Sequence, residues 1–274
     1  MKYNRKISDL KKNGFCVIKS VFSESYLNKI KSTINNLEYH KQVAVRGKDV
    51  TTSKVIQDLQ NKDKIFLDIL KNKTITEISM QLLNDKFYRG INEKLPNYIL
   101  NQYAARSSGN ESLDLHIDDR LPSSSDYPSF LLWGIPLINI SEFNGSTLVV
   151  PKTHKSGKYV VSNSKNIKTK SLNLKKGDLF AFDGRIWHGA NANQSNKDRW
   201  IIFITFTRWH IKQTYNYPLT FPKKYYKFLD DQLKMILGYA SFTKLDQRYG
   251  NTQRGDVKYA NKIINKIKNK SIVY

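Results

Sequence analysis

Between Tyr98 and Trp209 the helical period gives way to short segments rich in β-forming residues, with turn signals between them. Many short strands with turn signals between them are typical of a two-sheet jelly roll. The pattern predicts strands at 98–104, 112–118, 130–140, 146–151, 178–183 and 199–209.

Helical patterns flank this region on both sides. Before it, residues 23–39 begin with a capping serine and repeat apolar positions at helical spacing. The segments 65–70 and 75–83 also carry apolar residues at helical spacing. After it, the pattern predicts a helix at 225–237 and a loop at 249–256. Apolar residues from Tyr259 to Ile267 form one stripe of a lysine-rich last helix, which we expect to pack against its own domain.

Together these patterns predict a mainly β fold with flanking helices. We expect residues 1–274 to form one domain with a double-stranded β-helix (jelly roll, cupin-like) core at 86–210. Residues 1–85 would give helical support with an N-terminal strand, and 211–274 a C-terminal helical extension, so that helices at both ends buttress the core.

Two histidines and an aspartate form a candidate metal site. His116 and Asp118 are two residues apart, and in a strand such residues project from the same face, so both can hold one ion. His188 follows downstream. A lone His-x-Asp triplet is a weak signal, but two histidines and one carboxylate suit non-haem Fe(II) and leave positions open for a cosubstrate and oxygen. The sequence therefore predicts an oxygenase.

Arg199 extends this site. His188 opens a turn-rich connection between two β-patterned stretches, 178–187 and 199–209, and we expect a hairpin whose adjacent strands carry His188 and Arg199. The planar guanidinium can meet a carboxylate with two parallel hydrogen bonds. An acidic cosubstrate is therefore expected beside the metal.

Several motifs, in this order, resemble the phytanoyl-CoA dioxygenase family of Fe(II)- and 2-oxoglutarate-dependent oxygenases. They begin with Asn-Gly-Phe-Cys-Val-Ile-Lys at 13–19 and His-Ile-Asp-Asp at 116–119. The segment 145–155, the Gly-Asp-Leu at 177–179 and the block 188–199 continue the likeness, so that it covers most of the chain.

The resemblance implies His116, Asp118 and His188 as catalytic iron ligands and Arg199 as the partner of the distal carboxylate of 2-oxoglutarate. It also implies contacts of Trp133 and Asn101 with that cosubstrate. The implied cofactors are Fe(II), 2-oxoglutarate and O2, and the implied activity is hydroxylation with release of succinate and CO2. Halogenating relatives carry a small residue at the carboxylate position, so the presence of Asp118 favours hydroxylation.

Three further polar residues lie near the motifs. Asp119 and Arg120 directly follow the second ligand and are candidate substrate contacts or supports of the metal site, with Arg185 a further candidate of the same kind. The alternative for all of them is a solvated loop. His154 has no place in a complete three-ligand set, and we interpret it as structural.

The net charge of +23, from 46 basic and 23 acidic residues, invites a nucleic-acid interpretation. The lysines are scattered rather than clustered, so we do not favour a nucleic-acid partner and expect a small, anionic substrate instead. Two alternatives stay open: a non-catalytic metal-binding jelly roll acting as a sensor or binding module, and a nucleic-acid-binding or modifying protein.

The remaining features concern location. The single cysteine, Cys16, excludes an internal disulfide and is compatible with a reducing compartment. We expect neither a signal peptide nor a membrane span, and hence a cytoplasmic protein. The sequence gives no indication of oligomeric state.

Overall fold

The computed structural model describes residues 2–41, 44–45, 48–49, 53–86, 93–160, 167–242 and 256–270. Contacts between Cα atoms group the chain into two compact units. The first contains Met1–Leu59 and Tyr103–Thr205, and the second contains Gln60–Gln102 and Phe206–Tyr274.

The β structure consists of two main sheets and a short third one. The larger sheet has the strand order β1-β11-β8-β13-β6-β5-β2, the smaller β10-β9-β12-β7, and β3 pairs with β4. The strands are β1 Phe15–Ile18, β2 His40–Lys41, β3 Ala44–Val45, β4 Lys48–Asp49, β5 Lys54–Ile56, β6 Tyr98–Ser107, β7 Leu113–His116, β8 Phe130–Pro136, β9 Thr147–Val150, β10 Lys170–Leu172, β11 Leu179–Asp183, β12 Trp187–Ala190 and β13 Trp200–Arg208.

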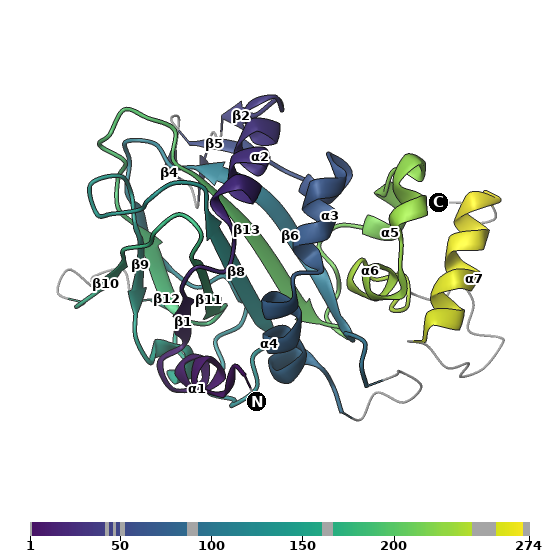
Figure 1. Cartoon of the computed structure of the whole chain (residues 1–274). Coiled ribbons are helices and arrows are strands. Elements are labelled where there is room, and N and C mark those ends of the chain that lie inside the picture. Colours follow the sequence, from purple (N-terminus) through teal and green to yellow (C-terminus); the bar gives the residue numbers. More distant parts are fainter. Residues whose placement is uncertain are drawn as a thin grey trace. The chain divides into compact units, whose positions relative to one another are not determined.

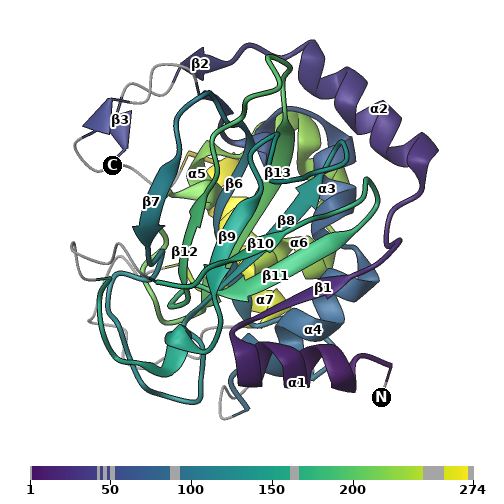
Figure 2. The same cartoon turned by 90° about the vertical axis from the view of Figure 1, so that its left-hand side faces the viewer.

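The two main sheets face each other across a common core. Phe180 and Phe182 of the larger sheet share one buried cluster with Val149 and Leu172 of the smaller. Figures 1 and 2 show the two layers, with β8, β11 and β13 in one and β9 and β12 in the other. Strand neighbours are mostly not consecutive in sequence, as in a jelly roll, so the predicted fold class is confirmed.

Helices α1 (Asn4–Asn13) and α2 (Glu24–Asn35) belong to the first unit, with the single turn η2 (Thr153–Lys155). The sequence interpretation missed α1, which buries only Ile7 and Leu10. It predicted α2, whose first turn is capped because Ser23 Oγ accepts a hydrogen bond from Tyr26 N–H at 3.3 Å. This helix ends before the predicted residue 39.

The second unit contains the remaining helices. They are α3 Lys64–Leu70, α4 Lys73–Leu83, α5 Tyr217–Thr220, η3 Lys223–Phe228, α6 Asp231–Ile236 and α7 Val257–Lys268, with the turn η1 Leu59–Asn61 at the unit boundary. Helices α3, α4 and α7 confirm three predicted helical patterns. In α7 the apolar stripe buries Ala260, Ile263 and Ile264, while its lysines stay exposed.

The single helix predicted at 225–237 is wrong. Instead, η3 ends at Phe228 and a separate helix, α6, begins after Asp230. The reason is a cap: Asp230 Oδ1 accepts the N–H of Leu233 at 2.9 Å, which begins a new helix in the middle of the predicted one. Most of the predicted loop at 249–256 lies outside the described residues.

The predicted hairpin carrying His188 and Arg199 is also wrong. Strand β12, with His188, lies between β9 and β7 in the smaller sheet, whereas β13, which follows Arg199, lies between β8 and β6 in the larger one. The stretch 178–187 is not one strand, because β11 ends at Asp183. A turn closed by a hydrogen bond from Ile186 N–H to the Asp183 carbonyl (2.9 Å) then leads the chain to the other sheet.

None of the helices that the structure describes is long and apolar enough to cross a membrane.

Candidate metal centre

His116, Asp118 and His188 converge on one point of the first unit. Strand β12 pairs with β7 so that His188 lies opposite His116, and the centroids of their rings are 4.1 Å apart. Asp118 Oδ1 lies 3.6 Å from His116 Nε2, and Asp118 Oδ2 lies 3.5 Å from His188 Nε2. The potential ligand atoms all lie within 4.8 Å of one another. Within the described part of the chain this is the group that could hold a metal ion.

Hydrogen bonds to backbone carbonyls orient both imidazoles. Nδ1 of His116 lies 2.8 Å from the carbonyl of Asp114, and Nδ1 of His188 lies 3.0 Å from the carbonyl of Ile186. A carbonyl oxygen can only accept, so each Nδ1 carries the proton and donates it. Each Nε2 then presents its lone pair toward Asp118, as a metal ligand must. Two such nitrogens and a carboxylate fit a divalent transition metal, with Fe(II) the typical occupant.

Asp118 reaches this point by a route that strand alternation did not predict. Strand β7 ends at His116, so Asp118 lies beyond it. Its position is set by the turn after β11, because the Gly184 carbonyl accepts the N–H of Asp118 at 2.8 Å. The ligand set of the sequence prediction thus comes together, but through a contact between loops.

Gly189 lets strands β12 and β7 approach each other beside the histidines. A Cβ atom at this position would lie 2.4 Å from the backbone carbonyl oxygen of Leu113, closer than real contacts allow. We expect Gly189→Ala to push β7 away, destabilise the protein by about 1–3 kcal/mol and weaken metal binding, since overpacking forces the backbone to shift. Chemical denaturation and Co(II) titration check this. A variant with wild-type stability and affinity would contradict the close approach.

Arg199 is almost completely buried, with 1% of its surface exposed. Its backbone N–H donates to Ser107 Oγ at 2.8 Å and its Nε to the carbonyl of Asn144 at 3.3 Å. Burial, reinforced by the positive charge of Arg106, lowers the pKa of the guanidinium to about 9, so the group is still protonated at neutral pH. Among the described residues no carboxylate forms an ion pair with it. A buried cation in this state is suited to receive a carboxylate ligand.

Arg106 is a residue of this region that the sequence interpretation missed. It falls between the predicted strands 98–104 and 112–118, but in the structure it lies in β6 opposite Val55 and is half-buried. Desolvation lowers its pKa and the charge of Asp118 raises it, while Arg106 in turn lowers the pKa of Arg199. Its charge therefore acts on both Asp118 and Arg199.

Asp119 and Arg120 differ in how they are engaged. Asp119 is buried, and its carboxylate accepts hydrogen bonds from Ser129 Oγ and from the N–H of Leu121. The side chain of Arg120 is exposed, while its carbonyl accepts a hydrogen bond from the Tyr159 hydroxyl at 2.9 Å. Asp119 therefore stabilises its own loop, and the substrate roles of both residues stay predictions.

The structure does not bring Trp133 to the three ligands. In β8, Trp133 is adjacent to Leu132, which belongs to the core cluster together with Phe182. The ring of Phe182 contacts that of His188, with centroids 4.5 Å apart. Because successive strand residues face opposite sides, Trp133 points away from the side where Phe182 meets His188. The predicted cosubstrate contact thus gains no support.

Asn101 and His154 lie in other surroundings. Asn101 belongs to the second unit, where its amide oxygen accepts hydrogen bonds from the N–H and hydroxyl of Thr214 at 3.1 and 2.9 Å. Its cosubstrate role stays a prediction. His154 is buried in η2, and its Nε2 donates to the carbonyl of Lys11 at 3.2 Å. This agrees with the structural role expected for it.

Residues 10–201 match the family described as "Phytanoyl-CoA dioxygenase (PhyH)". The chain belongs to this family, and the resemblance inferred from the motifs is confirmed. The curated relatives named dioxygenases include "Dioxygenase af480" of Aspergillus fumigatus, 25% identical over 210 residues, and "Dioxygenase himG" of Aspergillus japonicus, 26% identical over 216 residues. The matches cover 73% and 72% of this chain but only 61% and 66% of the two relatives.

Among solved structures, HygX from Streptomyces hygroscopicus with nickel and 2-oxoglutarate bound is similar in fold. The TM-score is 0.60 at 14% sequence identity, and the match covers 77% of this chain and 89% of HygX. This likeness supports the jelly-roll architecture.

Proposed function

We propose that this protein is an Fe(II)- and 2-oxoglutarate-dependent dioxygenase that hydroxylates a small, anionic organic substrate. In the proposed reaction one oxygen atom of O2 enters a substrate C–H bond as a hydroxyl and the other enters succinate, while 2-oxoglutarate loses CO2. The observation that carries the proposal is the convergence of two Nε2 atoms and one carboxylate within 4.8 Å, in a chain of the phytanoyl-CoA dioxygenase family.

The residues would divide the work as follows. His116, Asp118 and His188 hold the iron, which when bound supplies the redox chemistry with O2. Arg199 receives the distal carboxylate of 2-oxoglutarate through charge-assisted hydrogen bonds. The relatives named dioxygenases and HygX, whose structure holds nickel and 2-oxoglutarate, support a dioxygenase that uses 2-oxoglutarate.

The positive charge around the site supports an anionic substrate. Arg106, whose charge acts on Asp118, is a positive charge at the site in addition to Arg199, which is assigned to 2-oxoglutarate. The overall charge of +23 would also attract anions toward the protein.

We further propose that residues 1–274 act as one domain and that the protein is cytoplasmic.

The test is succinate release and oxygen consumption with Fe(II), 2-oxoglutarate and a panel of small acids, amines and thioesters. We expect at least one acidic compound to stimulate both, with one succinate formed per hydroxylated product. Tight binding of metal and 2-oxoglutarate without turnover on any compound would favour a sensor or binding module instead. A variant with His116→Ala serves as the inactive control.

A further inference from the structure

The turn between β11 and β12 contains a buried ion pair next to the metal centre. Asp183 Oδ1 accepts hydrogen bonds from the backbone N–H of Arg185 at 3.0 Å and from its Nε at 2.8 Å, and Asp183 Oδ2 accepts one from Nη2 at 2.7 Å. Both side chains are buried. Two parallel bonds between guanidinium and carboxylate fix the orientation of Arg185.

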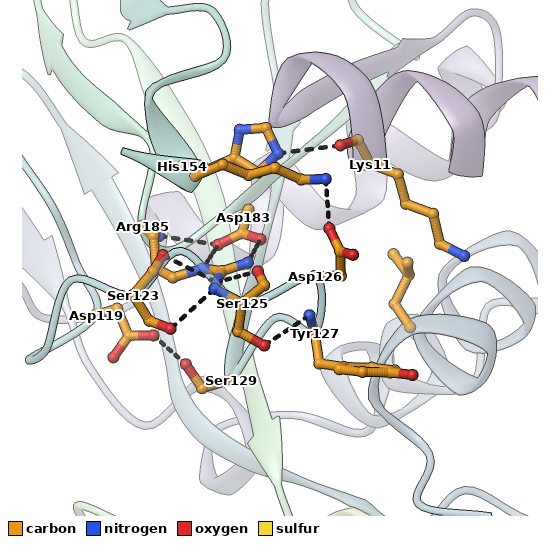
Figure 3. A network of polar contacts seen from close by, with 12 residues as sticks. Lys11, Asp119, Ser123, Ser125, Asp126, Tyr127, Ser129, His154, Asp183 and Arg185 are labelled. Atoms are coloured by element: carbon orange, nitrogen blue, oxygen red, sulfur yellow. Dashed lines mark hydrogen bonds and ion pairs between the residues drawn. The ribbon is translucent and has the colours of Figure 1, made fainter. Parts of the chain in front are cut away.

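The same guanidinium holds the loop that follows Asp118. Nη1 of Arg185 donates to the carbonyls of Ser123 and Ser125 at 3.2 and 2.7 Å, as Figure 3 shows. Ser123 and Ser125 lie in the loop 119–129, which follows Asp118 and leads to β8. Asp119 and Ser129 are hydrogen-bonded to each other at the two ends of this loop. Arg185 thus ties the loop to the turn through four of its five N–H donors.

This turn also contacts two of the three proposed ligands. The Gly184 carbonyl accepts the N–H groups of Asp118 and Asp119 at 2.8 and 2.9 Å. The Ile186 carbonyl accepts Nδ1–H of His188 at 3.0 Å. The residues on either side of Arg185 therefore set the position of Asp118 and the ring orientation of His188.

We propose that Arg185 is a positioning residue that fixes the turn 183–186 and the loop 119–129 as one rigid support for Asp118 and His188. This inference rests on the proposed function, because its effect is read at the metal centre. A lysine at 185 keeps the charge that Asp183 needs, but a single ammonium cannot reproduce the fork to Asp183 and also reach two carbonyls.

The test compares Co(II) affinity of the wild type, Arg185→Lys and Lys155→Ala. Lys155 pairs with Asp126 of the same loop at 2.6 Å, but both side chains are exposed, so this variant removes a loop contact without touching Arg185. We expect Arg185→Lys to bind Co(II) roughly 10–100-fold more weakly, the range typical when a residue that orients ligands is lost. Lys155→Ala is expected to bind like the wild type.

Two further measurements separate positioning from general destabilisation. Titrations are made well below the unfolding midpoint, where every variant is folded, and amide exchange is followed in residues 119–129. We expect a changed Co(II) absorption spectrum and faster exchange in this loop for Arg185→Lys alone. Should that variant fail to fold, Asp183→Asn, which retains an acceptor oxygen, takes its place with the same expected loss of affinity.

The outcomes are distinguishable. Wild-type affinity and spectrum in a folded Arg185→Lys or Asp183→Asn variant would overturn the positioning role and leave the proposed function intact. Equal weakening by Lys155→Ala would also overturn it, since any contact of the loop would then suffice. Absence of Co(II) binding by the wild type would overturn the proposed function and this inference with it.

Discussion

Asp118→Ala is expected to abolish 2-oxoglutarate turnover and to lower metal affinity by more than the loss of any residue that only orients a ligand. Asp118 is the one carboxylate of the candidate centre, and it lies within 3.6 Å of both histidine Nε2 atoms. Changes to residues that merely orient metal ligands lower affinity roughly 10–100-fold. Removal of a ligand itself should exceed that range. Co(II) or Fe(II) titration and succinate release measure the two effects.

Asp114→Asn is the matched control for this variant. Asp114 lies in β7 and is exposed, and its backbone carbonyl accepts the hydrogen bond from His116 Nδ1. The substitution removes a nearby negative charge but keeps that carbonyl, so metal affinity and turnover should stay close to wild type. Equal losses in both variants would point to a general effect of charge, and metal binding by Asp118→Ala at wild-type affinity would contradict the proposed ligand set.

The local motifs identified the three residues that the structure brings together, because their information lies in short stretches of sequence. His116, Asp118 and His188 stand in recognisable order, and the two histidines meet because β7 pairs with β12. What held Asp118 in place was not predictable, because the contact with the Gly184 carbonyl joins two loops about 66 residues apart along the chain.

Strand pairing was harder to predict than strand existence. The segments that form β6, β8 and β13 are rich in apolar, β-branched and aromatic residues, but this composition says nothing about which strands become neighbours. Consecutive strands are often assumed to form hairpins, and this assumption placed His188 and Arg199 side by side. In the structure the short turn at 183–186 moves the chain to the other sheet, so the two residues belong to different layers.

Arg199 variants should separate stability from cosubstrate binding. The guanidinium is buried without a carboxylate partner among the described residues, and Arg106 adds a like charge nearby. Replacing a buried ion by an apolar residue of similar volume is often neutral or stabilising. We therefore expect Arg199→Met to unfold at the same temperature as the wild type or a higher one in the absence of ligands, although it loses function.

The same variant should lose recognition of 2-oxoglutarate. Hydrogen bonds to charged groups contribute about 1.5–3 kcal/mol each, so loss of a two-bonded fork should raise the KM for 2-oxoglutarate at least 100-fold. In the wild type, saturation at about 100 times Kd should stabilise the Mn(II)-loaded protein by about 2.7 kcal/mol. This stabilisation, seen as a rise in Tm, should be absent from Arg199→Met and reduced in Arg199→Lys, which keeps the charge without the fork.

A 2-oxo acid without the distal carboxylate, such as 2-oxobutyrate, tests whether Arg199 acts on that group. The wild type should prefer 2-oxoglutarate strongly, because 2-oxobutyrate would leave the buried guanidinium uncompensated. In Arg199→Met both acids should bind with similar, weak affinity, since the group that discriminates between them is gone. If Arg199→Met still prefers 2-oxoglutarate, a cation other than Arg199 binds the distal carboxylate. Arg106, whose charge acts on Arg199, would then be the first residue to test.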